Sequence, residues 1–175
     1  TANSTSTIIK ALIDKEIFEE YYIQVDRVNF TGKTKEGQLQ LSEPQQTAFD
    51  GIKQSFIDRE VCLLHGVTSS GKTEIYIKLI EEYIKEEKQI LYLLPEIALT
   101  TQLVGRLRGY FGNRVAVFHS KYSNNERVEV WQQVLEQSPK AQIVIGARSA
   151  LFLPFSNLGL VIVDEEHEQT FKQVD

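Results

Sequence analysis

One short stretch of the chain carries the residue types that hold a nucleotide phosphate. Residues 66–73 read Gly-Val-Thr-Ser-Ser-Gly-Lys-Thr, which matches G-x-x-x-x-G-K-[ST]. The glycines let backbone N–H groups converge on phosphate oxygens, and the N-terminus of a following helix adds partial positive charge. Lys72 would serve the β- and γ-phosphates and the Thr73 hydroxyl would bind Mg²⁺, so we predict a site for ATP and Mg²⁺. The predicted nucleotide contacts are Gly66, Thr68, Ser69, Ser70, Gly71, Lys72 and Thr73.

The second candidate is the acidic end of an aliphatic run. Residues 160–163 are Leu-Val-Ile-Val, and Asp164, Glu165, Glu166 and His167 follow them. If the run is a strand, Asp164 can hold Mg²⁺ through water while Glu165 polarises the attacking water. A polar loop after a core strand is the simpler alternative, but a phosphate loop in the same chain favours catalysis. His167 either couples the ATP state to other motifs or is an exposed loop residue.

Hydrophobic periodicity from Ser42 onward predicts the scaffold that positions these motifs. Apolar runs predict strands at residues 61–64, 90–94, 115–118, 143–145 and 160–163. Helical spacing predicts helices around residues 49–56, 76–84, 99–111 and 128–135, the last after a Ser123/Glu126 capping box. Near-continuous apolar strands between amphipathic helices predict a doubly wound, largely parallel α/β sheet. Ligands of such sheets bind at the carboxyl ends of the strands, where both motifs fall.

The first 40 residues have a different pattern. Apolar residues between Ile8 and Ile17 recur at helical spacing, and residues 20–30 are strand-like. Residues 31–37 have the composition of a turn or wing, and Gln38–Leu41 is expected to return as a strand. A helix and a hairpin cannot bury much core alone. We therefore predict an appendage at 1–40 that is separable from a domain at 41–175.

Composition limits the possible classes of protein. The net charge is −5 and the pI is near 5.3, which on its own argues against a nucleic-acid binder. Cys62 is the single cysteine, so a disulfide framework or a Cys-rich zinc site within these residues is excluded, and a reducing cytoplasm is expected. Apolar runs are too short to span a membrane. Methionine is absent, which indicates a piece of a longer chain.

Three further stretches narrow the prediction. They are Leu-Pro-Glu-Ile-Ala-Leu-Thr at 94–100, Ile-Gly-Ala-Arg-Ser-Ala-Leu-Phe at 145–152 and Asp-Glu-Glu-His-Glu at 164–168. Together with the phosphate loop, the order and the residues of these stretches resemble those of DEAH-type superfamily-2 helicases. Within that group they most resemble the bacterial replication-restart helicases. Ala147 departs mildly, since many relatives are expected to have Thr there. The resemblance covers most of residues 41–175 and implies a RecA-like ATP-binding lobe of a 3′-to-5′ DNA helicase acting in replication restart and primosome assembly.

The resemblance also implies roles for individual residues. Gln45 would read adenine, although Ser42-x-x-Gln45 is itself a capping-box pattern. Stretches near single-stranded DNA would include Pro95, Glu96 and Thr100, and also Arg148 and Ser149, for which ordinary loop structure is the alternative. Phe171 and Lys172 would open an aromatic-rich loop that links DNA binding to ATP turnover. Residues 1–40 would be the end of a winged-helix domain.

The resemblance further implies parts that these 175 residues lack. An arginine that contacts the γ-phosphate would come from a second lobe, and zinc would be bound by a Cys-rich module after Asp175. We therefore expect nucleotide binding without efficient hydrolysis from this piece. Expected partners are forked or single-stranded DNA and other primosome and restart proteins, with no membrane. Alternatives are another superfamily-2 translocase, a P-loop kinase or metabolic ATPase, which the acidic strand end disfavours, and a nucleotide-binding or partner-docking module without turnover.

Overall fold

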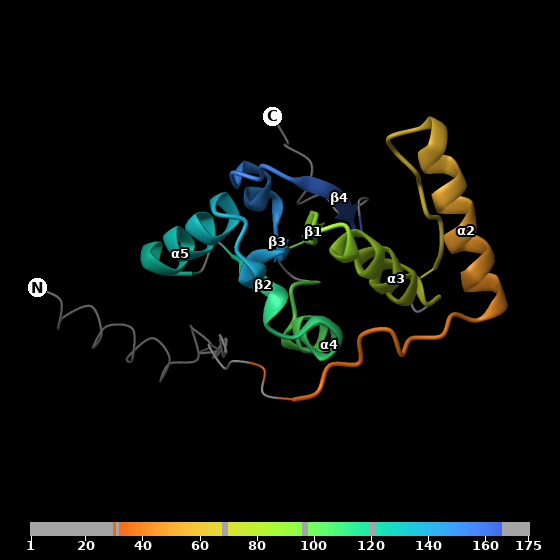
Figure 1. Cartoon of the computed structure of the whole chain (residues 1–175), viewed down its shortest axis with the longest axis horizontal. Helices are drawn as coiled ribbons and strands as arrows, with labels where there is room; N and C mark the ends of the chain where they lie inside the picture. Colours follow the sequence, from red (N-terminus) through yellow and green to blue (C-terminus); the bar gives the residue numbers. More distant parts are fainter. Residues whose placement is uncertain (1–29, 31, 68–69, 96–97, 120–121, 166–175) are drawn as a thin grey trace, which may run out of the picture.

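Parallel strands in the order β2-β3-β1-β4 form the centre of the molecule (Figure 1). The computed structural model describes residues 30, 32–67, 70–95, 98–119 and 122–165. The strands of this part are β1 (Gln89–Leu93), β2 (Val115–Phe118), β3 (Ile143–Gly146) and β4 (Leu158–Val163). The helices are α2 (Glu43–Asp58), α3 (Lys72–Lys85), α4 (Thr101–Phe111) and α5 (Asn124–Leu135), and the short 3-10 helices are η2 (Gly112–Arg114), η3 (Pro139–Ala141) and η4 (Arg148–Phe152).

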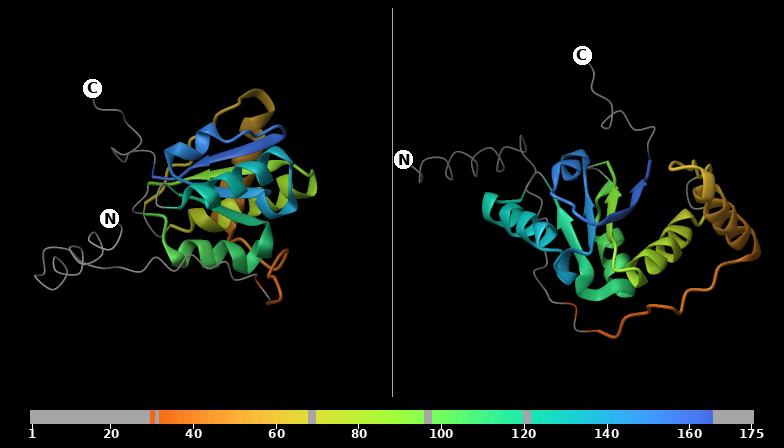
Figure 2. Two further views of the ribbon diagram at one scale, coloured as in Figure 1. Left: turned by 90° about the vertical axis from the view of Figure 1, so that its left-hand side faces the viewer. Right: turned by 45° about the horizontal axis from the view of Figure 1, so that its top comes forward.

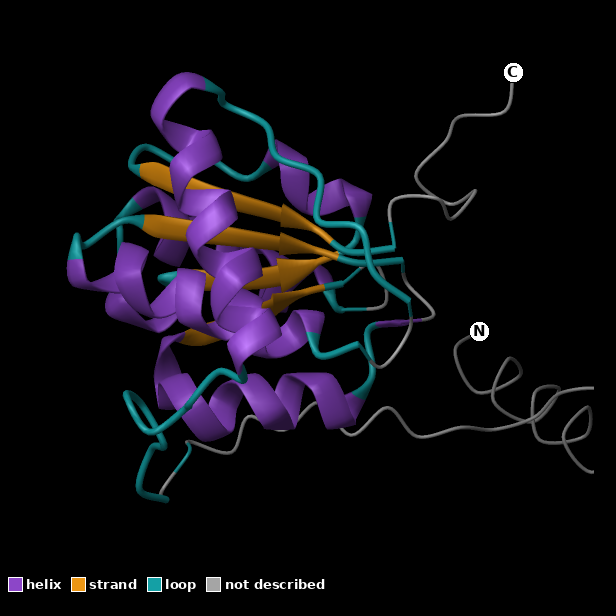
Figure 3. Cartoon of the chain, turned by 90° about the vertical axis from the view of Figure 1, so that its right-hand side faces the viewer, coloured by secondary structure: helices purple, strands orange, loops and turns teal. Residues whose placement is uncertain are grey.

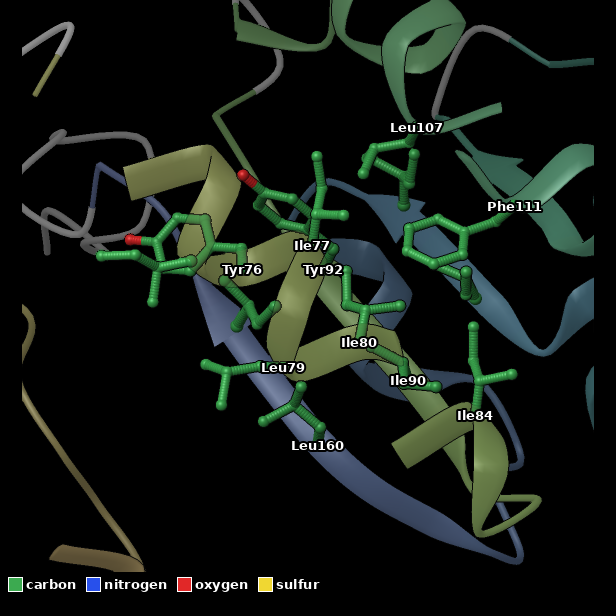
Figure 4. Packing of buried hydrophobic residues seen from close by; sticks show 14 of the residues in the cluster. Tyr76, Ile77, Leu79, Ile80, Ile84, Ile90, Tyr92, Leu107, Phe111 and Leu160 are labelled. Carbon is green, nitrogen blue, oxygen red and sulfur yellow. The ribbon is translucent and has the colours of Figure 1, made fainter. Parts of the chain in front are cut away.

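Helices cover both faces of the sheet, which confirms the predicted doubly wound α/β fold (Figure 2). Successive side chains of β1 point to opposite faces. Ile90 and Tyr92 pack with α3 and α4, as Figure 4 shows, whereas Leu91 and Leu93 pack with α5. Every residue of β1 is buried, as expected of a central parallel strand covered on both sides. The amphipathic helices predicted from sequence therefore pack with their apolar sides against the sheet.

The carboxyl ends of the strands lie along one edge of the sheet (Figure 3). Leu93 at the end of β1 is in register with Gly146 of β3 and with Val163 of β4. The loops that follow these neighbouring strands therefore leave the sheet at the same level. Those loops contain three of the motifs identified in the sequence, at residues 95–100, 148–149 and 164–165.

The predicted strand at residues 61–64 is wrong. These residues are extended and alternate in exposure, with Val61 and Leu63 exposed and Cys62 and Leu64 partly buried against the core. They pair with no strand in the part of the chain that the structure describes. A strand needs a backbone partner, and the available edge, β4, pairs only with β1 in the described structure. A cleft separates the outer edge of β4 from the segment 61–64, and both line it.

The predicted returning strand at Gln38–Leu41 is also wrong. Residues 32–41 are instead an extended strap with a turn at Gly37 (φ 73°) that lies across α3 and α4 (Figures 1 and 2). The backbone N–H of Lys35 donates to the Gly109 carbonyl (2.9 Å), and that of Gly37 donates to Oε1 of Glu81 (2.8 Å). These backbone N–H groups of the strap therefore donate to the helices rather than to a second strand of a hairpin. Residues 1–29 and 31 lie outside the described part, so the winged-helix assignment and the 40/41 boundary stay predictions.

Two helices begin at capping boxes whose pattern is visible in the sequence, and α4 begins at a cap that was not predicted from the sequence. Capping boxes are present at Ser42/Gln45 before α2 and at Ser123/Glu126 before α5. Thr100 caps α4 by accepting a hydrogen bond from the Leu103 N–H (3.3 Å). None of the described helices is long and apolar enough to cross a membrane.

Candidate nucleotide-binding site

The phosphate loop leads directly into the N-terminus of α3. Gly71 caps this helix in the left-handed conformation (φ 83°), which favours a residue without a Cβ. The N–H of Ser70 donates to the Val67 carbonyl (3.2 Å), which curls the loop. The Lys72 ammonium donates to the carbonyls of Gly66 (2.6 Å) and Val67 (3.3 Å) and so lies over the loop. Thr68 and Ser69 fall outside the described residues.

Gln45 connects α2 to this loop. Its Nε2 donates to the Gly71 carbonyl (3.2 Å), and its Oε1 accepts from the N–H (2.9 Å) and the hydroxyl (3.0 Å) of Ser42. A Cβ on residue 71 would overlap Nε2 of Gln45. The capping role proposed for Gln45 is therefore confirmed, and the same side chain lies against the phosphate loop. Its adenine-reading role stays a prediction.

Asp164 follows β4 and is held at both carboxylate oxygens. Its backbone N–H donates to the Leu93 carbonyl (3.0 Å), which extends the pairing of β4 with β1. The Tyr92 hydroxyl donates to Oδ2 of Asp164 (2.9 Å), and the Glu165 N–H donates to Oδ1 (3.1 Å). Alternation along the strand places Asp164 on the same face as Ile162, which is the face covered by α3. The carboxylate therefore lies on the side of the sheet where the phosphate loop begins its helix.

The partner of Asp164, Tyr92, is fully buried in the core. Its ring packs edge-on against Tyr76 of α3, with ring centroids 5.7 Å apart (Figure 4). Burial, followed by the charge of Asp164, holds the pKa of the Tyr92 hydroxyl well above its usual value. The phenol therefore stays protonated and remains a hydrogen-bond donor to the carboxylate.

Glu165 is exposed beside Asp164 in an uncommon backbone conformation. Its φ of 54° is in the left-handed region, which a non-glycine residue rarely adopts. Such outliers persist where the surrounding structure enforces them, and they cluster at functional sites. The conformation lets the Glu165 N–H reach Asp164. Glu166 and His167 lie outside the described residues, so the alternatives for His167 stay open.

Both motifs line one open cleft of about 1900 Å³ that runs along the whole of β4. Lys72 and Thr73 contribute from the α3 side, and Asp164 and Glu165 from the sheet. A hydroxyl and a carboxylate are hard oxygen ligands of the kind Mg²⁺ prefers. No group of three His, Cys, Asp or Glu side chains that could enclose a metal occurs in the described residues. The donor set therefore fits Mg²⁺ held by few protein atoms together with phosphates and water.

An ion pair closes another side of the cleft. Arg106 of α4 pairs with Glu74 in the first turn of α3, and both residues line the cleft. An acidic residue near a helix N-terminus interacts favourably with the helix dipole. The pair links the helix that begins at the phosphate loop to its neighbour α4.

Of the predicted DNA-contact residues, the structure describes Pro95 and Thr100, which follow β1, and Arg148 and Ser149, which follow β3. Arg148 is exposed, whereas Ser149 is half-buried and its hydroxyl has no hydrogen-bond partner in the described structure. The Pro95 ring is buried, and the Thr100 hydroxyl caps α4. Glu96, Phe171 and Lys172 lie outside the described residues. DNA contact at these positions stays a prediction.

Sequence reasoning missed Tyr92 and Arg106. The apolar pattern predicts Tyr92 only as part of a strand, although it is the one residue with a polar tip between Ile90 and Leu94. A buried tyrosine hydroxyl normally needs a partner, so this was an available signal. Arg106 gave no signal, because its partner Glu74 is 32 residues away in the sequence.

Comparison with known proteins gives consistent matches. The model of the family described as DEAD/DEAH box helicase matches residues 42–174. The chain is 43% identical over 175 residues to the replication restart protein PriA of Bacillus subtilis, covering 98% of the chain and 22% of the relative. Identity to PriA of Haemophilus influenzae is 42% over 180 residues, which cover 98% of the chain and 24% of that relative. Identity to PriA of Synechocystis is 52% over 111 residues, which cover 63% of the chain and 13% of that relative. The chain thus spans less than a quarter of these relatives, and the resemblance drawn from the motifs is confirmed.

Proposed function

Because the chain belongs to the DEAD/DEAH box helicase family, we propose that residues 41–175 are the ATP-binding lobe of a DNA helicase motor. The observation that carries this proposal is the single cleft that Lys72, Thr73, Asp164 and Glu165 all line. Two sequence motifs far apart in the chain supply these side chains. A core strand that merely ended in a polar loop would have no reason to share a cleft with a phosphate loop.

Each of these groups has a part in the proposed reaction. The family implies ATP and Mg²⁺ in general, and a bound Mg²⁺ would neutralise phosphate charge. The loop N–H groups and Lys72 bind the phosphates. Thr73 and Asp164 would hold the metal, the latter through water, while Glu165 accepts a hydrogen bond from the attacking water and orients it.

For the longer protein we propose a 3′-to-5′ helicase that acts in replication restart and primosome assembly in the cytoplasm. Support comes from the relatives, which are named replication restart proteins. Forked or single-stranded DNA and other primosome and restart proteins are the proposed partners. Residues 1–40 would be the end of a winged-helix domain, and Pro95, Thr100, Arg148, Ser149, Phe171 and Lys172 would lie near the DNA.

Residues 1–175 alone should bind nucleotide without efficient hydrolysis. Charge that develops on the transferred phosphoryl group must be stabilised on several sides. We propose that an arginine from a second lobe covers the side opposite Lys72, and such an arginine contributes roughly 10³–10⁵ in rate. We also place zinc outside these residues, since Cys62 is their single cysteine.

The test is steady-state phosphate release by the longer protein with and without single-stranded DNA. We expect DNA to stimulate turnover, and Glu165→Gln to abolish it while ATP binding stays nearly unchanged, because the substitution keeps size and removes charge. Glu136→Gln, an exposed carboxylate after α5, is the matched control and should retain full activity. Unimpaired turnover in Glu165→Gln would remove this residue from the mechanism. Nucleotide binding with no turnover under any condition would favour a nucleotide-binding or docking module.

A further inference from the structure

The Tyr92–Asp164 hydrogen bond joins the buried core to the edge of the cleft. Tyr92 belongs to β1, which lies between β3 and β4; it is 0% exposed, and its hydroxyl donates to Oδ2 of Asp164 at 2.9 Å. The ring extends from β1 into the core and packs edge-on against Tyr76 of α3 (Figure 4). The donor therefore has a position set by core packing rather than by the loop that follows β4.

A carboxylate at the end of a strand has no intrinsic orientation, because its terminal torsion is broad. Two donors on different oxygens remove that freedom for Asp164: the Tyr92 hydroxyl on Oδ2 and the Glu165 N–H on Oδ1. Each carboxylate oxygen has further lone-pair sites for other partners. The arrangement orients the carboxylate while leaving it able to accept hydrogen bonds from metal-bound water.

We propose that Tyr92 is a positioning residue that orients Asp164 for Mg²⁺ in the nucleotide site. The proposal rests on the proposed function, because it takes Asp164 as the residue that holds the metal. Tyr92 itself contacts neither nucleotide nor metal in this scheme; it acts through the carboxylate. Partners of this kind, one step removed from a metal, typically change metal affinity by 10- to 100-fold when they are lost.

Tyr92→Phe isolates the hydroxyl, because it keeps the ring that packs against Tyr76. The measurement is calorimetric titration of the chain with ADP at a series of Mg²⁺ concentrations, together with thermal melts. We expect the Mg²⁺ concentration at half-maximal enhancement of ADP binding to rise about 10-fold or more. ADP affinity without Mg²⁺ should stay within about twofold, because no nucleotide contact is lost. Tyr110→Phe is the matched control, since its half-buried hydroxyl has no hydrogen bond in the described structure, and it should change neither quantity.

A second comparison separates positioning from general packing. In an Asp164→Asn background, Tyr92→Phe should cause no further shift in the Mg²⁺ midpoint, because the residue through which it acts has already been changed. An unchanged midpoint in Tyr92→Phe, or an equal shift in both backgrounds, would overturn the proposal. If Asp164→Asn shifts the midpoint and Tyr92→Phe does not, the inference fails and the proposed function stands. If Asp164→Asn has no effect on the midpoint, both fail.

Discussion

Gly71 shows how one residue serves both the helix and the phosphate loop. It adopts φ 83° at the N-terminus of α3, and its carbonyl accepts a hydrogen bond from Gln45. The conformation is rarely adopted by a residue with a side chain, and a Cβ would in addition meet the Gln45 amide. Backbone freedom and close approach are therefore both required at this position.

Gly71→Ala is predicted to destabilise the chain by about 1–3 kcal/mol and to weaken ADP·Mg²⁺ binding, because the backbone conformation is strained and Gln45 must move. Gly105→Ala is the matched control within α4, where a Cβ would meet nothing within 4 Å. It should stabilise the chain by about 0.5–1 kcal/mol through helix propensity. Thermal melts and calorimetry measure both effects. A Gly71→Ala chain that melts and binds like the parent would show that the left-handed conformation is not needed.

For single residues, the sequence predicts a role where the residue belongs to a short motif with a characteristic spacing. Spacing alone singles out the loop at 66–73, Asp164 and the capping box at Ser42, and of these the structure confirms the capping box. The second contact of Gln45, to Gly71, joins positions 26 residues apart, and the Tyr92 contact to Asp164 spans 72. Such partners are set by the register of strands and by helix packing, which no short pattern encodes.

Among the elements, the segment between α2 and the phosphate loop departs most from prediction. Its alternation matches a strand, with Cys62 and Leu64 turned toward the core. The alternation of apolar residues determines which side chains face the core, but strand pairing needs a neighbouring strand that is far away in the sequence. β4 is the edge strand next to β1, its Val161 and Val163 side chains are exposed, and it lines the same cleft as this segment. An exposed apolar strand edge is a ready template for another strand.

We predict that ADP·Mg²⁺ brings residues 61–64 into pairing with β4, because a ligand in the cleft contacts the loop that immediately follows this segment. Hydrogen exchange measured by mass spectrometry should then slow at least about tenfold for the amides of 61–64, since paired backbone amides are protected. Peptides from α5, on the opposite face, serve as the internal control and should be unchanged. Equal exchange at 61–64 with and without nucleotide would show that the segment does not pair on binding.

The strap at 32–41 is the other element that short patterns did not predict. The Gly37 N–H donates to Glu81, a carboxylate that is 4% exposed and also pairs with Lys78 (3.0 Å). Leu39 and Leu41 pack on the main core. Together these contacts connect the residues before α2 to the helix that begins at the phosphate loop.

A chain beginning at Ser42 should be less stable than one beginning at Phe30 by about 2–4 kcal/mol. It loses a hydrogen bond to a buried carboxylate and the burial of two leucines. The melting temperature should fall by at least about 5 °C. A chain beginning at Gln38 keeps the leucines and should melt cooperatively at an intermediate temperature. Identical melting curves for the Phe30 and Ser42 forms would mean that the strap contributes nothing to the fold.

For the whole molecule, sheet topology determines which parts of the sequence meet. Strand order β2-β3-β1-β4 brings the loops after β3, β1 and β4 side by side, although they are far apart in the chain. The parallel, doubly wound class and the sheet edge at which the candidate site lies follow from apolar runs and helix spacing. The absence of a sheet partner for residues 61–64 did not follow, because it depends on how α2 and α3 are placed relative to β4.

Calorimetric titration with ADP and Mg²⁺ measures whether this chain binds nucleotide with Mg²⁺ at the loop 66–73. The chain should bind, and Lys72→Ala should bind at least about tenfold more weakly, because a hydrogen bond from a charged donor contributes about 1.5–3 kcal/mol. Lys85→Ala, an exposed lysine at the other end of the same helix, should bind like the parent. Equal affinity in Lys72→Ala and the parent, or no binding by the parent, would contradict the account.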